Sequence, residues 1–290
     1  MAVLWNPRAE LREFVSIVES DPAHGAMLLR AANSARYAAA DPIRSVRVAT
    51  VRIGLDAARQ LISSAMLRPQ FETLAQAGLN VPALWERQLA VGLLVRDFAQ
   101  HDRRPEDEIG SAFATGLLHS VGRLALAARS PQRYRSVVQL VREGAGVFES
   151  ERQAFGLDSL VLTRQLARRW SLPPSIADAL SRQDELPASG LPLLLHEAIE
   201  VADLLGFDDG FSEALEPLST LPADHERAPA FGQAGGLGQL SARLDWFAEA
   251  FGARRAHITQ PRRRRILEVA HGVTPLVDAP VVDGELPRAA

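Results

Sequence analysis

One histidine of the chain stands where packing alone does not explain it. His119 lies in the run 116–124 (GLLHSVGRL), inside an apolar helical stretch that has no need of an imidazole. A histidine at neutral pH can ligate a metal ion or transfer a proton. A lone histidine on an apolar helix is more often a core side chain held by a hydrogen bond. The two interpretations differ in the partners that the rest of the chain must supply.

Residue types that the chain lacks exclude several kinds of chemistry. It has no cysteine, which excludes disulfides, thiolate metal sites, iron–sulfur clusters and cysteine nucleophiles. All 32 basic residues are arginine, so Schiff-base chemistry and a phosphate-loop lysine are excluded too. The seven histidines occur without a nucleophile motif such as G-x-S-x-G, so no serine triad can be assigned. The glycines of the run 235–238 (GGLG) do not follow a strand, which argues against a phosphate-binding loop.

A cluster of arginines lies within twelve residues near the C-terminus. Guanidinium groups at this density can bind phosphates, a nucleotide second messenger, nucleic acid or an acidic protein surface. A solvated helix end would have the same composition. The formal net charge of −3 argues against uniform coating of nucleic acid, so local charge is the relevant quantity. The six members are Arg254, Arg255, Arg262, Arg263, Arg264 and Arg265.

Nearly every segment with a readable hydrophobic period repeats like a helix, which predicts an all-α fold. Asp21-Pro22 supplies an N-cap and a first-turn proline, and Ser45 opens a helix that Gly54 can end. Asp56 can then cap the next helix. The pair over 46–67 also has the spacing of a helix-turn-helix, so DNA reading is an alternative to ordinary bundle packing. Further helices are expected near residues 11–18, 82–99, 105–118, 131–144, 159–170, 192–205, 244–251 and 262–270.

Composition divides the chain into four parts. With 47% hydrophobic and 23% charged residues, the 290 residues have the composition of a folded globular protein. Residues 1–206 are expected to form one helical bundle. An irregular Gly/Pro-rich connection over 207–240, a short C-terminal helical extension with the arginine cluster over 241–272, and a disordered tail over 273–290 are expected to follow. The N-terminus has no signal-like segment and no apolar run reaches membrane-spanning length, so a cytoplasmic location without membrane insertion is expected.

Several motifs in order resemble the HDOD family, the HD-related output domain proteins of bacteria. One is the run around His119. The run 28–35 resembles the family's helix with an asparagine-serine pair, here Asn33-Ser34, and the steps Ile53-Gly54-Leu55 and Trp170-x-Leu172-Pro173 match as well. The resemblance covers roughly residues 10–206. It implies an HD-like multi-helix bundle, to which the C-terminal helical extension is added.

The resemblance also implies where a metal centre would lie. The HD superfamily holds one or two metal ions with a first histidine, a histidine-aspartate pair and a later aspartate, and hydrolyses phosphate esters. In this chain the first histidine corresponds to Arg87 or a neighbour, the pair is His119 with Ser120 in place of aspartate, and the later aspartate is Asp203. A catalytic ion needs about three protein ligands and an open position. We therefore expect a vestigial site with no metal, no cofactor and no catalytic residue.

Each of these polar residues also has a plain structural interpretation. His119 can be hydrogen-bonded within the core, and Asp203 can pair with a buried arginine or cap a helix. Asn33 and Ser34 can bond between helices, and Arg123 can be a solvated or paired surface charge.

Three functions are open at this point. The first is a non-enzymatic signalling module, a pseudoenzyme that binds another signalling protein, with a homodimer as one possible form. The second is an HD-type phosphohydrolase built on His119 and Asp203 with manganese, iron or nickel. The third is a nucleotide or nucleic-acid binder that uses the C-terminal arginine cluster.

Overall fold

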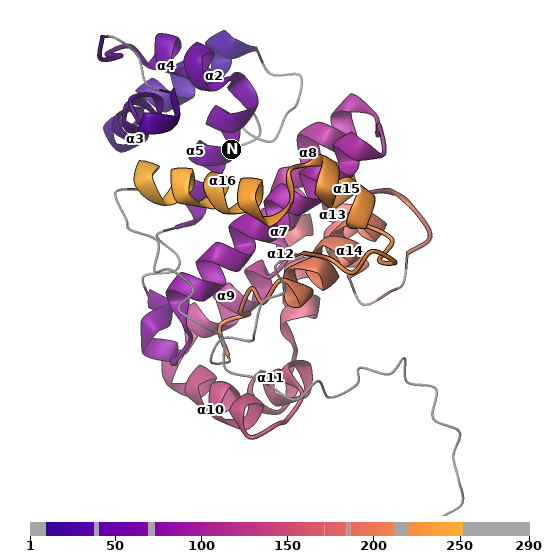
Figure 1. Cartoon of the computed structure of the whole chain (residues 1–290). Helices are drawn as coiled ribbons and strands as arrows, with labels where there is room; N and C mark the ends of the chain where they lie inside the picture. Colours follow the sequence, from indigo (N-terminus) through magenta and orange to yellow (C-terminus); the bar gives the residue numbers. More distant parts are fainter. Residues whose placement is uncertain are drawn as a thin grey trace, which may run out of the picture.

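The structure is a computed structural model that describes residues 10–37, 41–68, 73–170, 172–183, 185, 187–211 and 220–251. Within these ranges every regular element is a helix and there is no strand, so the predicted all-α fold is confirmed (Figure 1). None of the helices described is long and apolar enough to cross a membrane. The N-terminal group comprises α2 (Leu11–Glu19), α3 (Pro22–Ala32), η1 (Ala35–Tyr37), α4 (Val46–Ile53) and α5 (Leu55–Leu67).

A long helix, α7, runs through the middle of the molecule and packs against α8, α14, α15 and α16 (Figure 1). α8 lies against it at such close range that a Cβ on Gly116 would stand 2.6 Å from the Cα of Gly92. Those two glycines therefore set the spacing of the helix pair. The elements after the N-terminal group are η2 (Thr73–Ala77), α7 (Val81–His101), α8 (Glu106–Leu118), α9 (Val121–Arg129), α10 (Pro131–Arg142), α11 (Val147–Phe155), α12 (Ser159–Arg169), α13 (Pro174–Ser181), α14 (Gly190–Leu204), α15 (Ala228–Gln233) and α16 (Gly236–Ala250).

The capping residues recognised in the sequence begin helices in the structure. The Asp21 carboxylate accepts from the Ala23 amide at 2.8 Å with Pro22 in the first turn of α3, and the Ser45 hydroxyl accepts from Val48 at 3.4 Å. Gly54 has φ of +89° and separates α4 from α5. α5 already begins at Leu55, so Asp56 lies in its first turn and is not its cap.

The expectation of an irregular connection over 207–240 is wrong for its second half. α15 begins at residue 228 with Pro229 in its first turn, and α16 begins at residue 236. Gly235 and Gly236 have φ of +88° and +59°, which makes the turn between the two helices. The glycines and proline thus serve helix ends. The expected helix at 262–270 and the tail over 273–290 lie outside the described residues.

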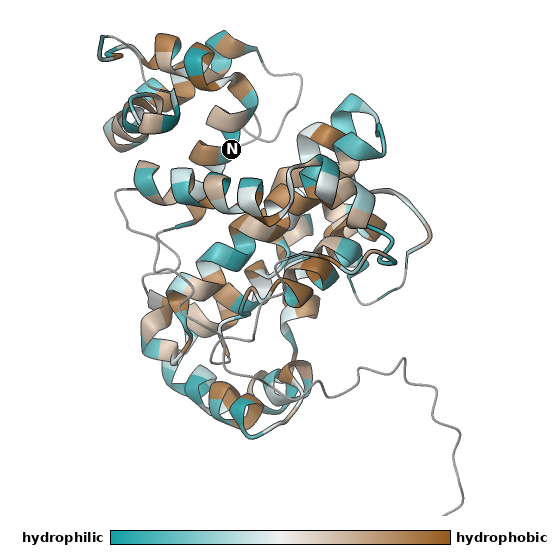
Figure 2. Cartoon of the chain, viewed as in Figure 1, coloured by the Kyte–Doolittle hydropathy of each residue, from teal (hydrophilic) through white to brown (hydrophobic). Residues whose placement is uncertain are grey.

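Two hydrophobic clusters form the interior. The larger joins the N-terminal group to α7, α8 and α13–α16, and it includes Phe98, Phe113 and Phe247. The smaller joins side chains of η2, α9 and α10, and it includes Tyr134 of α10. Figure 2 shows the corresponding pattern, since the helices carry hydrophobic and hydrophilic positions along the same ribbon. The C-terminal helices therefore share their core with the bundle predicted for residues 1–206.

Candidate functional site

The four residues predicted for the vestigial site come from three parts of the fold. Arg87 lies in the second turn of α7, His119 and Ser120 form the junction between α8 and α9, and Asp203 lies at the end of α14. The junction is tight because only two residues separate the end of α8 at Leu118 from the start of α9 at Val121. Gly122 in its first turn lies directly against α12, and its amide donates to the Thr163 hydroxyl at 3.0 Å. This contact fixes the backbone that carries His119.

Arg87 occupies the centre of the site with a permanent positive charge. Its Nη1 donates to Asp203 Oδ1 at 2.5 Å and to the backbone oxygen of Phe207 at 2.6 Å. The Arg87 side chain is only 7% exposed, whereas that of Asp203 is 57% exposed. A guanidinium does not lose its proton in a protein, so this pair cannot open by deprotonation of the arginine. The Asp203 carboxylate, which the resemblance implies as a metal ligand, is thus paired with Arg87.

His119 is buried and hydrogen-bonded within the fold. Its Nδ1 lies 2.6 Å from the backbone oxygen of Gly116, and a carbonyl oxygen can only accept, so Nδ1 carries the proton. Burial lowers the pKa of His119 to about 3, and the positive charges of Arg87 and Arg123 act in the same direction. The hydrogen bond to Gly116 opposes this shift without cancelling it. The imidazole is therefore neutral at physiological pH.

Ser120 contributes a neutral hydroxyl to the site. Its hydroxyl accepts from the Gln88 side-chain amide, and both residues are buried. Among the residues that the structure describes, no group of three or more histidine, aspartate or glutamate side chains could hold a metal ion. The residues present therefore do not fit the divalent ion of the HD superfamily, and no reaction step can be assigned to one here.

A buried charged network adjoins the site, and the sequence did not indicate it. Arg123 is not the surface charge that we expected, because it is 9% exposed. Its Nη1 donates to the backbone oxygen of Asp209 at 3.2 Å, and its guanidinium lies 4.8 Å from the centre of the Phe211 ring. Nearby, Glu151 is fully buried and accepts from Tyr134 Oη at 2.6 Å and from the Ser159 amide at 2.7 Å. Burial raises the pKa of Tyr134, and the carboxylate of Glu151 adds to that shift while Arg123 opposes it.

Asn33 and Ser34, the asparagine-serine pair, form hydrogen bonds to the backbone near the end of α3. The Asn33 side-chain amide donates to the backbone oxygens of Leu29 at 2.8 Å and of Ile43 at 2.9 Å, and its oxygen accepts from the Ile43 amide at 2.8 Å. The Ser34 hydroxyl donates to the backbone oxygen of Ala31 at 2.7 Å. Both residues therefore bond to the end of α3, and Asn33 also fixes the chain that enters α4.

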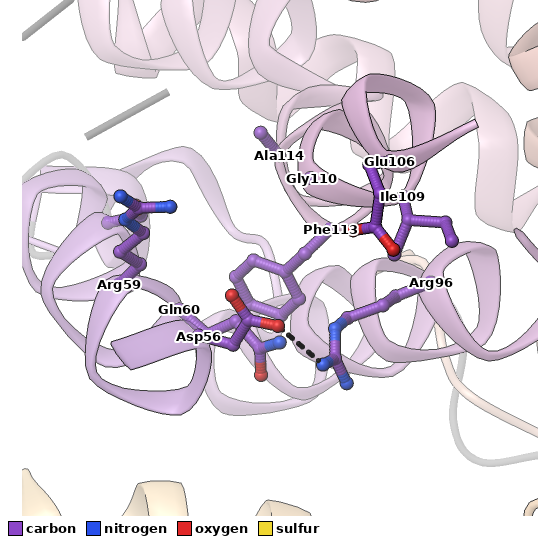
Figure 3. Close-up of a pocket in the computed structure, with 10 residues that line it drawn as sticks. Asp56, Arg59, Gln60, Arg96, Glu106, Ile109, Gly110, Phe113 and Ala114 are labelled. Carbon is purple, nitrogen blue, oxygen red and sulfur yellow. Dashed lines mark hydrogen bonds and ion pairs between the residues drawn. The ribbon is translucent and has the colours of Figure 1, made fainter. Parts of the chain in front are cut away.

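A separate pocket lies between α5, α7 and α8, and the sequence did not point to it (Figure 3). Its polar lining carries charges of both signs, and Arg96 Nη2 lies 3.0 Å from Asp56 Oδ2. The aromatic ring of Phe113 forms part of its wall. None of the residues predicted for the vestigial site lines this pocket. The C-terminal arginine cluster lies outside the described residues and is not placed relative to either site.

The described part of the chain is an all-helical domain in which Arg87 pairs with Asp203 and its charge acts on the pKa of His119. A model of the HDOD domain family matches residues 1–186, well over half of the chain. The chain therefore belongs to the HDOD family, as its motifs predicted. No curated protein matches it significantly.

Solved structures share this fold at low sequence identity. An HDOD domain protein of unknown function from Geobacter sulfurreducens is 23% identical with a TM-score of 0.61, and the match covers 87% of this chain and 80% of that one. A proposed phosphohydrolase from Shewanella amazonensis is 23% identical with a TM-score of 0.58, over 86% and 89%. A proposed signal transduction protein from Marinobacter aquaeolei is 22% identical with a TM-score of 0.59, over 85% of this chain and 55% of that one.

Proposed function

We propose that this chain is a non-catalytic regulatory module that acts by binding another protein. The observation that carries the proposal is the pair between Arg87 and Asp203, at 2.5 Å, between residues that the family resemblance assigns to the metal site. A fixed cation there repels a dication by several kcal/mol at short range, even with substantial solvent screening. His119, neutral and bonded to Gly116, leaves too few ligands for an ion that must activate water.

The family and one neighbour also support a regulatory role. The Marinobacter aquaeolei protein that shares the fold is described as a signal transduction protein. The rival function, a phosphohydrolase with an unusual ligand set, is suggested by the description of the Shewanella amazonensis protein. Fold alone does not separate the two, because unrelated functions recur on one scaffold. The side chains at the site favour the regulatory function.

Metal analysis together with a hydrolysis assay tests this proposal. The full chain is purified, incubated with manganese, iron or nickel, desalted and analysed for bound metal. It is then assayed with bis(p-nitrophenyl) phosphate and with cyclic dinucleotides. We expect substoichiometric metal and no metal-dependent turnover. Turnover that needs added metal and disappears in His119→Ala would overturn the proposal in favour of the phosphohydrolase.

A further inference from the structure

We propose that the exposed face of α4 is a docking surface for an acidic amphipathic segment of a partner protein. The inference rests on the proposed function, since it names the surface through which the regulatory module acts. This face, called the α4 stripe, consists of Arg47, Val48, Val51 and Arg52. All four side chains are exposed, whereas the opposite face of the helix is buried in the N-terminal group.

The two valines lie at the centre of the α4 stripe. At about 100° per residue, Val48 and Val51 fall between Arg47 and Arg52 on the helix circumference. Val48 is 53% and Val51 is 65% exposed, the highest values among the large hydrophobic side chains that the structure describes as exposed. Single exposed apolar residues are common on protein surfaces. Two adjacent ones flanked by charges have the arrangement of a small interface, with an apolar centre and a polar rim.

Both charged side chains of the α4 stripe are arginines. The helix α4 contains no acidic residue, and Arg47 forms no ion pair with any of the described residues. Arg52 donates through Nε to the backbone oxygen of Tyr37 at 3.2 Å, which orients its guanidinium. Arg44, just before the N-cap, is exposed and adds a positive charge at the end of α4 that carries Arg47. A carboxylate-bearing partner complements this set of charges.

The position of α4 in the fold leaves the α4 stripe accessible. α4 packs on α2, α3 and α5, and it lies at the outer edge of the N-terminal group, away from α9–α12 (Figure 1). Its buried residues, Val46, Ala49, Thr50 and Ile53, already fill the contact with those neighbours. The exposed valines therefore contribute nothing to the core that the structure describes.

The neighbouring helix favours a protein partner over nucleic acid. In a helix-turn-helix the second helix enters the major groove and presents its side chains to the base edges. Here the second helix, α5, buries seven consecutive or near-consecutive residues from Ala58 to Ala65 against the bundle. It is not available to a groove. Amphipathic protein segments, by contrast, dock through apolar anchors at helical spacing, which Val48 and Val51 match.

Site-specific photo-cross-linking tests this docking surface. The full chain carries p-benzoylphenylalanine at position 51, in cells that naturally produce the protein, and the cross-linked peptide is identified by mass spectrometry. The matched control carries the same group at position 136, an exposed site on α10. We expect capture at position 51 only, of a partner segment that combines aspartate or glutamate with apolar residues at helical spacing.

A synthetic peptide of the captured segment then gives the affinity by fluorescence anisotropy. We expect Val48→Ser/Val51→Ser and Arg47→Glu each to weaken binding about tenfold or more, with binding to the wild type falling as salt rises. Val161→Ser, the same substitution at another exposed valine, leaves the affinity unchanged. Circular dichroism should show that all these variants stay folded, because the replaced side chains face solvent.

Several results would overturn the docking surface. Position 51 could capture nothing specifically, or it could capture nucleic acid, this chain itself, or a segment without acidic residues. Equal affinity of the wild type and the double valine variant would also overturn it. In any of these cases, absence of metal-dependent hydrolysis in the wild type would leave the proposed regulatory function standing, so the two failures are distinguishable.

Discussion

At the scale of single residues, we attribute the expected lack of a metal centre to Arg87 and Ser120. Arg87→His with Ser120→Asp supplies an imidazole and a carboxylate beside His119 and frees Asp203 from its ion pair. We expect this double variant to bind Mn²⁺ in isothermal titration calorimetry, because up to four ligands then become available. The control Arg87→Met removes the cation without adding a ligand and should not bind. Equal behaviour of the double variant and the wild type would contradict this account.

His119 should make stability depend on acid. In the unfolded chain its imidazole takes up a proton near pH 6.5, but in the folded chain only near pH 3. Protonation therefore favours the unfolded state as pH falls from 6.5 toward 3, and stability from this group is fully present above pH 6.5. The slope approaches about 1.4 kcal/mol per pH unit.

Urea unfolding between pH 7 and pH 4 measures this dependence. His119→Asn keeps an N–H near the position of Nδ1 for the Gly116 oxygen but does not titrate, so its free energy of unfolding should fall less steeply than that of the wild type. Parallel curves for the two proteins would contradict the depressed pKa. So would an NMR titration that places the His119 midpoint near pH 6.5.

The sequence could point to these residues only where a local motif marks them. His119, with its glycine and serine neighbours, stands out in an apolar run, and Asp203 follows by its family position. Arg123 and Glu151 gave no such signal. They are buried because the fold brings them together next to Tyr134, although they are 28 positions apart in the sequence. A charge at the surface of one amphipathic helix and a charge inside a helix junction look alike in sequence.

At the scale of elements, glycines decide how closely helices approach. A Cβ on Gly122 would overlap the Ser159 backbone oxygen and lie 2.7 Å from the Thr163 amide nitrogen, where α9 meets α12. Gly122→Ala should therefore lower the free energy of unfolding by about 2 kcal/mol or more, or prevent folding. Gly238→Ala is the matched control, because its Cβ meets nothing within 4 Å inside α16. It should stabilise by about 0.5–1 kcal/mol. Chemical denaturation of both variants checks the opposite signs.

Capping residues and glycines explain which helices could be predicted from the sequence. Helices with an Asp or Ser cap begin where the sequence indicates, as in α3, where a proline follows Asp21, and in α4, which Ser45 caps. The second half of α16 lies in the helix expected at 244–251, whereas α15 and the start of α16 were missed because Gly235 and Gly236 were interpreted as part of an irregular connection. Their positive φ angles join two packed helices instead. Whether a glycine loosens or turns a chain depends on the apolar residues that follow it, here Leu240, Leu244 and Phe247.

At the scale of the whole molecule, the C-terminal helices connect the N-terminal group to the bundle (Figure 1). Arg227, before α15, donates to the Asp102 carboxylate at 2.8 Å and through Nε to Glu197 at 2.8 Å. Arg243 of α16 pairs with Asp97 of α7. On the other side, the Trp246 indole donates to the Ala31 backbone oxygen at 3.4 Å. One element thus contacts both halves of the fold.

These contacts predict where the chain can be shortened. A chain that ends at Phe211 keeps the bundle expected from the sequence but loses α15 and α16. It uncovers Phe113, which stacks on Phe247 at 6.1 Å, and Phe98, which lies 5.2 Å from the Arg227 guanidinium. Removing five large apolar side chains from the core costs on the order of 10 kcal/mol, since each contributes about 1.5–3 kcal/mol. That sum is comparable to the entire stability of a typical domain. The lost side chains are Phe231, Leu240, Leu244, Trp246 and Phe247.

Size-exclusion chromatography and urea unfolding compare this truncation with a chain that ends at Phe251. The longer chain keeps every core contact described for α16, so it should be monodisperse and unfold in one cooperative transition. The shorter chain should aggregate or unfold without cooperativity. The carboxylates that pair with Arg227 and Arg243 lose their partners, and aromatic rings of the core become exposed. If the two chains unfolded within about 1 kcal/mol of each other, α16 would be an appendage and the bundle a self-sufficient domain. The expected result instead makes the C-terminal helices a structural part of the folding unit.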